Sequence, residues 1–366
     1  MRSVLVGAAL AFLLTLFGTP LAIRYLRKLR VGQEIRTDGP QAHASKRGTP
    51  TMGGIVFILA SVVAYAGIHV YLAIAPCTGA PGFGDTQCSD DRSVTAGGLL
   101  LLGLFVGMGL VGFADDYIKV RKRRSLGLNK RGKIVGQLLV GVIFGALAVM
   151  LPDQKNHTVA SEYISFIHDI GWLNITKFGA VLFIAFVVIS TANAVNLVDG
   201  LDGLATGSSV MVLMAYSLIG YWEFRHPHVY PDVSNPLEVA LVAAIVAGAC
   251  FGFLWWNASP AKVFMGDTGA LGLGGLIAGL AVATKTELLL IVIGALFVLI
   301  VVTEIIQIVS FRTFGRRVFR MVPLHHHFEL AGWPEINIVI RFWMIAAVGV
   351  AVGVGIFYAD FLRLLP

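Results

Sequence analysis

The strongest constraint on this chain is a repeated apolar segment of about 20 residues, the length of a helix that crosses a lipid bilayer. Ten such segments occur, at residues 3–23, 52–75, 94–114, 134–151, 177–195, 204–222, 238–256, 268–284, 287–310 and 339–361. Backbone groups in lipid must be hydrogen-bonded within the chain, so each segment is expected to be helical. We therefore predict an all-α, polytopic membrane protein with about ten transmembrane helices, forming one domain over residues 1–366.

Composition excludes a water-soluble enzyme. The 366 residues are 57% hydrophobic and 13% charged, with a mean hydropathy of +0.80, whereas soluble domains are roughly 45–50% apolar and about 25% charged. The net charge of +7 is spread over short loops between apolar segments. Such loops fit contact with membrane lipids and do not form the single basic surface that nucleic-acid binding requires, so no nucleic-acid partner is expected.

Basic residues also predict the orientation. Most Lys and Arg follow the odd-numbered segments, as in residues 24–51 and 115–133. The alternate loops contain only Arg92, Lys155, Arg225 and Lys285. Because Lys and Arg are enriched in cytoplasmic loops, the first set is expected to face the cytoplasm and both termini to lie outside. Cys77 and Cys88 then share one exterior loop, as either a disulfide or two free thiols.

Polar residues collect in the loops predicted to be cytoplasmic. Asp115 and Asp116 are adjacent at the end of an apolar segment, where like charges are costly unless they titrate or bind a cation. A solvated helix end is the alternative interpretation. Carboxylate oxygens are the ligands that suit Mg²⁺, so the pair is a candidate for Mg²⁺ chemistry.

A second polar set recurs every three residues, at Asn193, Asn196, Asp199 and Asp202. On a helix, each step of three residues turns a side chain by about 60°, so the four groups would spread over roughly half a turn. Two Asp-Gly steps also favour a turn. The segment is therefore either a polar helix face or a helix end that breaks into a short loop.

Asp267 comes just before the eighth apolar segment, so its carboxylate is expected near the free N–H groups of a helix N-terminus, where a simple helix cap is the alternative. His325, His326 and His327 cannot all face one way on a helix and make a poor transition-metal site. Imidazoles can instead donate to phosphate or move protons near neutral pH.

Together these motifs resemble the polyprenyl-phosphate N-acetylhexosamine-1-phosphate transferases. The resemblance lies in Asp-Asp-x-x-Lys at 115–119, Asn-x-x-Asn-x-x-Asp-Gly-x-Asp-Gly at 193–203 and Gly-Asp at 266–267. Residues 46–54 and 323–333 resemble the bacterial branch that transfers phospho-N-acetylmuramoyl-pentapeptide. This resemblance implies that UDP-N-acetylmuramoyl-pentapeptide and undecaprenyl phosphate react with Mg²⁺ to give lipid I and UMP in peptidoglycan synthesis, at the cytoplasmic face of the bacterial plasma membrane.

The resemblance also implies roles for individual residues. The expected catalytic residues are Asp115, Asp116, Asp267, His325 and His326, with Asp267 as the Mg²⁺ ligand. The expected substrate-binding residues are Lys46, Thr51, Lys119, Lys130, Lys133, Asn193, Asn196, Asp199, Gly200, Leu201, Asp202, Asn257, Phe264 and His327, with Phe264 beside uracil. Either Asp115 deprotonates the lipid phosphate for direct attack, or Asp267 forms a covalent intermediate; direct attack is favoured because a metal-bound carboxylate is a weak nucleophile.

Two other functions fit parts of the sequence. One is a related transferase that uses a UDP-N-acetylhexosamine. The other is a proton-coupled secondary transporter built around Glu304, an acid inside the ninth apolar segment. A transporter predicts paired internal repeats with broken helices, and no repeat is evident in the sequence. The family resemblance suggests a homodimer.

Overall fold

Ten long apolar helices form the protein, as the sequence predicts. The computed structural model describes residues 1–29, 32, 46, 48–74, 94–122, 127–153 and 156–364, so the predicted Cys77–Cys88 loop lies outside the described residues. The helices long and apolar enough to cross a membrane are α1 (Arg2–Lys28), α2 (Gly54–Ile74), α4 (Ala96–Lys122), α5 (Lys130–Met150), α6 (Thr176–Val198), α7 (Leu204–Arg225), α8 (Pro236–Asn257), α9 (Gly266–Ala283), α11 (Ala295–Phe314) and α13 (Glu335–Leu364).

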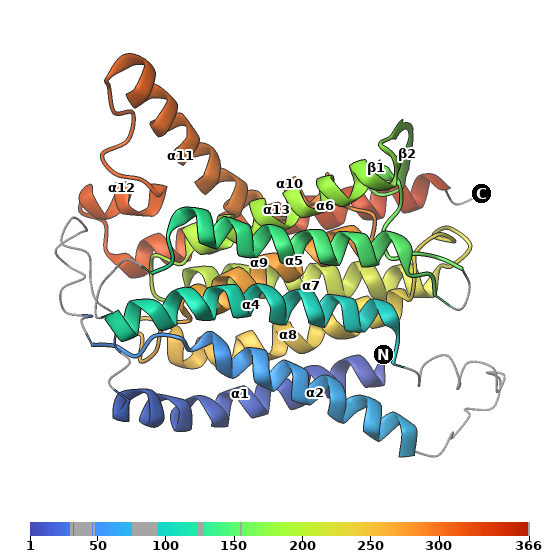
Figure 1. Cartoon of the computed structure of the whole chain (residues 1–366), viewed down its shortest axis with the longest axis horizontal. Helices are drawn as coiled ribbons and strands as arrows, with labels where there is room; N and C mark the ends of the chain where they lie inside the picture. Colours follow the sequence, from blue (N-terminus) through green and yellow to red (C-terminus); the bar gives the residue numbers. More distant parts are fainter. Residues whose placement is uncertain are drawn as a thin grey trace.

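Helix α9 is the centre of the bundle. Of its 18 residues, 89% are buried, against 28% of the most apolar 18-residue stretch of α1 and of α11. Helix α9 packs between α4 and α6 (Figure 1). Small residues allow this approach: a Cβ added to Gly112 of α4 would collide with the carbonyl of Asp267 on α9. The end of α4 and the beginning of α9 therefore touch through their backbones.

The predicted span 287–310 is divided in the structure. A short helix, α10 (Leu290–Ile293), precedes α11, and the two meet at Gly294, a residue type with low helix propensity. Beyond this break α11 leans away from the bundle, and the short helix α12 (Leu324–Leu330) lies below it, at the left of the picture (Figure 1). The ninth span thus begins later and ends later than the sequence predicts.

A two-stranded antiparallel hairpin at the opposite end of the bundle was not predicted. It consists of β1 (Tyr163–Ser165) and β2 (Asp169–Asn174), strands too short for an alternating pattern to stand out. The carbonyl of Ser165 accepts a hydrogen bond from the Leu288 amide at 3.1 Å. The hairpin is thereby tied to the segment that follows α9.

Candidate active site

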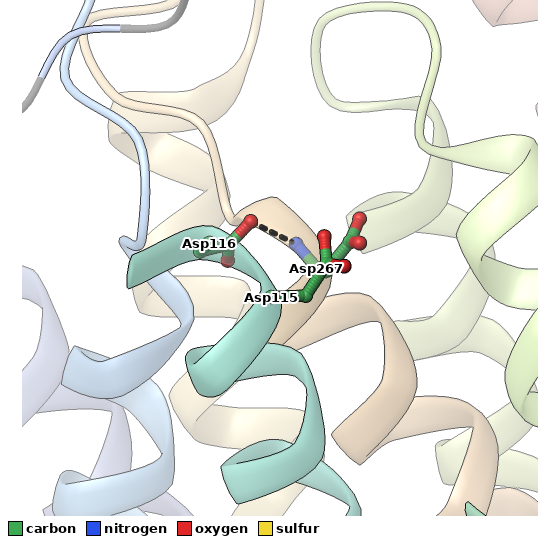
Figure 2. Close-up of side chains that lie close together, drawn as sticks. All are labelled: Asp115, Asp116 and Asp267. Carbon is green, nitrogen blue, oxygen red and sulfur yellow. Dashed lines mark hydrogen bonds between the residues drawn. The ribbon is translucent and has the colours of Figure 1, made fainter. Parts of the chain in front are cut away.

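Three carboxylates meet where α4 approaches α9. Asp115 and Asp116 lie near the C-terminal end of α4, and Asp267 is the second residue of α9. One oxygen from each carboxylate lies within 4.8 Å of the others, and Figure 2 shows the side chains side by side. The structure therefore brings together the three acids that the sequence places in two separate motifs.

Asp116 holds the N-terminus of α9. Its carboxylate accepts hydrogen bonds from the Asp267 amide at 3.2 Å, and from the Thr268 amide at 2.9 Å and hydroxyl at 2.8 Å (Figure 2). These groups include N–H donors that a helix leaves free at its start. The capping carboxylate thus comes from α4, and Asp267 is left to face other partners.

Gly266 makes this contact possible. It has a φ of +70°, which glycine adopts without strain. A Cβ at this position would also press against the Asp116 carboxylate and lie 3.0 Å from the Thr51 hydroxyl. The glycine of the Gly-Asp motif therefore serves close packing at the site, and buried Thr51 lies at its edge.

Lys119 joins all three carboxylates. Its Nζ lies 2.6 Å from Asp115, 3.0 Å from Asp267 and 3.6 Å from Asp116. The spacing of four residues along α4 places Lys119 over Asp115. The carboxylate oxygens thus converge on a position where positive charge is stabilised, so this set of hard oxygen donors fits a divalent cation such as Mg²⁺.

Asp267 has partners from two further helices. Lys133 Nζ lies 2.7 Å from one of its oxygens, and Asn196 Nδ2 donates to the other at 2.8 Å. Helix α5 begins just before Lys133 because the side chain of Asn129 accepts a hydrogen bond from the Gly132 amide. Asp267 is consequently held as a charged carboxylate by two ammonium groups and an amide.

Gln137 is a residue that sequence reasoning missed. It exchanges hydrogen bonds with Asn193, at 2.8 Å and 3.3 Å, and is fully buried. A signal was present: Gln137 is a polar residue inside an apolar segment, one helical turn after Lys133. It orients Asn193, which lies one turn before Asn196 on α6.

The segment 193–203 combines both predicted alternatives. Asn193 and Asn196 lie on α6, which ends at Val198, and Asp199 and Asp202 lie in the turn before α7. Gly203 closes the turn with a φ of +77°. The polar groups therefore project from a helix end and from the turn that follows it.

The environment of Asp199 favours its protonated form. Burial, followed by the negative charges of Asp267, Asp116 and Asp202, raises the pKa of Asp199 to about 8. An ionised carboxylate would add another negative charge beside the cluster. Near neutral pH, Asp199 is therefore mainly a neutral acid that can donate a hydrogen bond.

The three histidines of α12 face different surroundings. His325 is fully buried, and a Cβ on Gly200 would collide with its imidazole. His326 Nδ1 lies 2.5 Å from the Glu329 carboxylate, and His327 Nδ1 accepts the Arg320 amide at 3.1 Å. The three side chains therefore point to different neighbours: His325 packs against the 199–203 turn, whereas His327 contacts the α11–α12 connection.

Two predicted pocket residues brace the loop between α8 and α9. Asn257 accepts from the Thr206 hydroxyl at 2.7 Å and donates to the Val263 carbonyl at 3.0 Å. The backbone of Phe264 is paired with residues 50–53: its amide donates to Pro50, and its carbonyl accepts from Gly53, both at 2.8 Å. These bonds fix the backbone from which the half-buried Phe264 ring projects.

The remaining predicted residues differ in their distance from the carboxylates. Lys46 pairs with Asp202 at 2.7 Å, away from the acidic cluster, and Leu201 is a buried turn residue. Lys130 is exposed at the start of α5, and no contact among the described residues joins it to the cluster. The structure therefore gives no support to Lys130 as a member of the site.

Comparison with known proteins defines the family. Residues 98–285 match the sequence model of glycosyl transferase family 4, and residues 46–58 match phospho-N-acetylmuramoyl-pentapeptide-transferase signature 1. A protein of that name from Salinispora arenicola is 56% identical over 99% of both chains, and one from Streptomyces coelicolor is 52% identical over 98% of both. The chain belongs to the phospho-N-acetylmuramoyl-pentapeptide-transferase family.

The family matches include most of the residues described above. The signature over residues 46–58 contains Lys46 and Thr51, and the longer match contains all three carboxylates of the cluster. A Corynebacterium efficiens member of the phospho-N-acetylmuramoyl-pentapeptide-transferase family covers 100% of this chain at 48% identity. This match reaches both ends of the chain and so includes α12 and α13.

Proposed function

We propose that the protein transfers phospho-N-acetylmuramoyl-pentapeptide from its UDP carrier to undecaprenyl phosphate, giving lipid I and UMP in peptidoglycan synthesis. Family membership over the full chain supports the reaction. The single observation that carries the proposal is the convergence of Asp115, Asp116 and Asp267 on Lys119 at one end of a bundle of membrane-length helices. A lipid phosphate and a water-soluble nucleotide can meet at such an end.

We further propose that Mg²⁺ binds at this cluster. Asp267 and one or both of Asp115 and Asp116 would hold it, and the ion would neutralise charge on the diphosphate. The oxygen donors fit the ion, as the position of the Lys119 ammonium among them indicates. Lys119 and Lys133 would turn from the carboxylates toward substrate phosphates.

Direct attack is the mechanism that the contacts favour. An oxygen of the lipid phosphate forms a bond to the β-phosphorus of the nucleotide, while the bond between that phosphorus and the oxygen of the departing UMP breaks. Asp115, held by the Leu128 amide at 2.8 Å, would accept the proton of a monoprotonated lipid phosphate. Asp267 is a poor nucleophile because three groups already stabilise its negative charge.

We place the site end of the bundle in the cytoplasm. Exposed basic residues such as Arg121, Lys122, Arg316 and Arg317 lie in segments on this side of the helices, and Lys and Arg are typical of cytoplasmic loops. The nucleotide sugar would then arrive from the cytoplasm and the lipid from the inner leaflet. Labelling of single cysteines introduced at both ends, in intact cells, tests this orientation.

UMP release by detergent-solubilised protein tests the reaction. We expect release from UDP-N-acetylmuramoyl-pentapeptide only when undecaprenyl phosphate and Mg²⁺ are both present, and none with EDTA. Slow release or isotope exchange without the lipid would instead support a covalent intermediate. Product from UDP-N-acetylglucosamine alone would assign the protein to a related transferase reaction, and substrate uptake into proteoliposomes without UMP release would favour transport.

A further inference from the structure

A group of ion pairs separate from the carboxylate cluster joins Lys46, Asp202 and Glu335. Lys46 Nζ lies 2.7 Å from Asp202 and 2.6 Å from Glu335. The same Glu335 oxygen also accepts a hydrogen bond from the Asp202 amide, at 2.9 Å. These side chains are mostly shielded from solvent, with 18%, 3% and 21% of their surfaces exposed for Lys46, Asp202 and Glu335.

The group connects segments that are distant in the sequence. Glu335 lies 289 residues from Lys46 and 133 from Asp202. The second oxygen of Asp202 accepts the Ala261 amide at 2.9 Å, which adds the loop that carries Phe264. One carboxylate at the start of α13 therefore helps to fix the relation of Lys46, the 199–203 turn and the 258–265 loop.

The charges explain why Glu335 is needed in this arrangement. Burial lowers the pKa of the Lys46 ammonium, but hydrogen bonds and the negative charges of Asp202 and Glu335 outweigh burial and raise it above the usual range. Lys46 is thus firmly protonated and shared between two acids. Without Glu335, the Lys46 ammonium would pair with Asp202 alone, and the Asp202 amide would lose its hydrogen-bond acceptor.

A simpler role for Glu335 is to favour the N-terminus of its own helix, where an acid is stabilising. That role requires no contact with other segments. The observed side chain instead accepts two hydrogen bonds from residues of the 46–58 and 193–203 motifs. Hydrogen bonds between charged groups are short and geometrically demanding, so the contact constrains both motifs.

We propose that Glu335 is a positioning residue, which holds Lys46 and the 199–203 turn, both expected from the family resemblance to bind substrate, in the arrangement that binds the UDP-sugar. Glu335 does not take part in bond making or breaking. This inference rests on the proposed function for the identity of the nucleotide. Independently of that identity, Glu335 on α13 is inferred to control the affinity for the nucleotide and not the affinity for the lipid substrate.

The test compares Glu335→Ala and Glu335→Gln with Asp360→Ala. Asp360 is a matched control because it lies at the other end of α13 and pairs with His168 at 3.0 Å. Steady-state UMP release gives KM for each substrate and kcat, and equilibrium binding of UMP gives a direct affinity. Thermal unfolding of each variant reports its stability.

We expect Glu335→Ala to raise KM for the UDP-sugar and Kd for UMP by roughly tenfold, the scale of one hydrogen bond to a charged group. KM for the lipid and kcat should stay within about threefold of the unsubstituted protein. Glu335→Gln should recover part of the affinity, because its amide oxygen can accept from both donors. Asp360→Ala should leave all of these constants unchanged.

Unchanged KM and Kd in Glu335→Ala would overturn the inference. So would equal losses for both substrates that parallel a fall in thermal stability, since that pattern is structural damage. If Glu335→Ala does not fold, Glu335→Gln alone decides between these outcomes. If the unsubstituted protein binds UMP but forms no lipid product, the proposed function fails, while a weaker UMP affinity in the variants still supports the positioning role.

Discussion

Both ends of the helix bundle bury ionisable side chains, and they arrange them differently. At the site end, carboxylates from α4 and α9 share Lys119 and Lys133 at short distances. At the hairpin end, Lys285 reaches Asp169 at 3.3 Å. Among the described residues, the site cluster is the one place where three acidic, histidine or cysteine side chains converge closely enough to bind a metal ion. The close approach of three acids therefore distinguishes the site end from the hairpin end, because both ends bury charged side chains.

A perturbed pKa does not separate the two ends. Burial raises the pKa of Glu287, just after α9, to about 8, the same value as for Asp199. The difference lies in the neighbours: Asp199 is surrounded by acids of the site, whereas Glu287 faces Lys285 and Asp169 in a segment that anchors the hairpin. Glu287 accordingly belongs to the scaffold at the hairpin end.

The largest effect should come from Asp267→Asn. Loss of its charge removes the shared partner of Lys119 and Lys133 and the expected Mg²⁺ ligand, so UMP release should fall by at least about 100-fold. Thermal unfolding should change little, because Asp116 still caps α9. A rate near that of the unsubstituted protein at low Mg²⁺ would contradict the metal assignment.

Lys133 at the site end and Lys285 at the hairpin end provide the next comparison. Lys133→Ala should reduce turnover by roughly tenfold to 100-fold with a small change in stability. Lys285→Ala should leave turnover within about twofold but lower the free energy of unfolding by about 1.5 kcal/mol, since it removes the charged hydrogen-bond donor of the part-buried Asp169. Measurements of UMP release and of thermal unfolding on both variants test this difference between Lys133 and Lys285. Equal losses of turnover in the two variants would contradict it.

A smaller effect is expected for the aromatic ring of the α8–α9 loop. Phe264→Ala should raise KM for the nucleotide substrate by roughly threefold to tenfold and leave KM for the lipid nearly constant, because a base stacked on an aromatic ring loses about 1 kcal/mol or more without it. Phe264→Tyr keeps the ring and serves as the control. Equal shifts for both substrates would argue against stacking on uracil.

The next effects concern the pH dependence of stability, and the smallest effect expected, on UMP affinity, follows from the same groups. Asp199 and Glu287 have raised pKa values, so the folded state retains protons that the unfolded state loses above about pH 4. The contribution of these two groups to stability therefore declines from about pH 4 and is lost as both ionise near pH 8. Thermal unfolding should show a weaker decline for Asp199→Asn and for Glu287→Gln than for the unsubstituted protein.

UMP binding separates the two titrations. Ionisation of Asp199 near pH 8 adds negative charge beside the phosphate site, so the UMP affinity of the unsubstituted protein should fall about two- to threefold from pH 7 to 9. Glu287→Gln should retain this dependence, and Asp199→Asn should lack it. If Glu287→Gln alone lost the pH dependence, the site end would not be where it originates.

The sequence predicts the number of spans and most of the site, because both signals are local. An apolar run identifies a helix by itself, and Asp115 and Asp116 are conspicuous at the end of one. The hairpin at 163–174 was missed because its strands are short and it is held by a contact with Leu288, far along the chain. The break at Gly294 was missed because a single glycine is common within membrane-spanning helices.

The partners within the site were less predictable than its members. Asp267 was expected near the free N–H groups of α9, yet Asp116 caps that helix from 151 residues away. Gln137 could have been noticed as a polar residue on the face of Lys133. Glu335 had no such signal, because an acid at the start of a helix is ordinary and its significance depends on where Lys46 lies in space.

The joint between α4 and α9 also limits how the molecule can move. Sliding of one helix along the other would break the Asp116 cap and force backbone atoms together at Gly112. The two helices therefore behave as one rigid body that carries all three carboxylates. A movement of the bundle that admits substrates or releases UMP would therefore have to leave this joint intact.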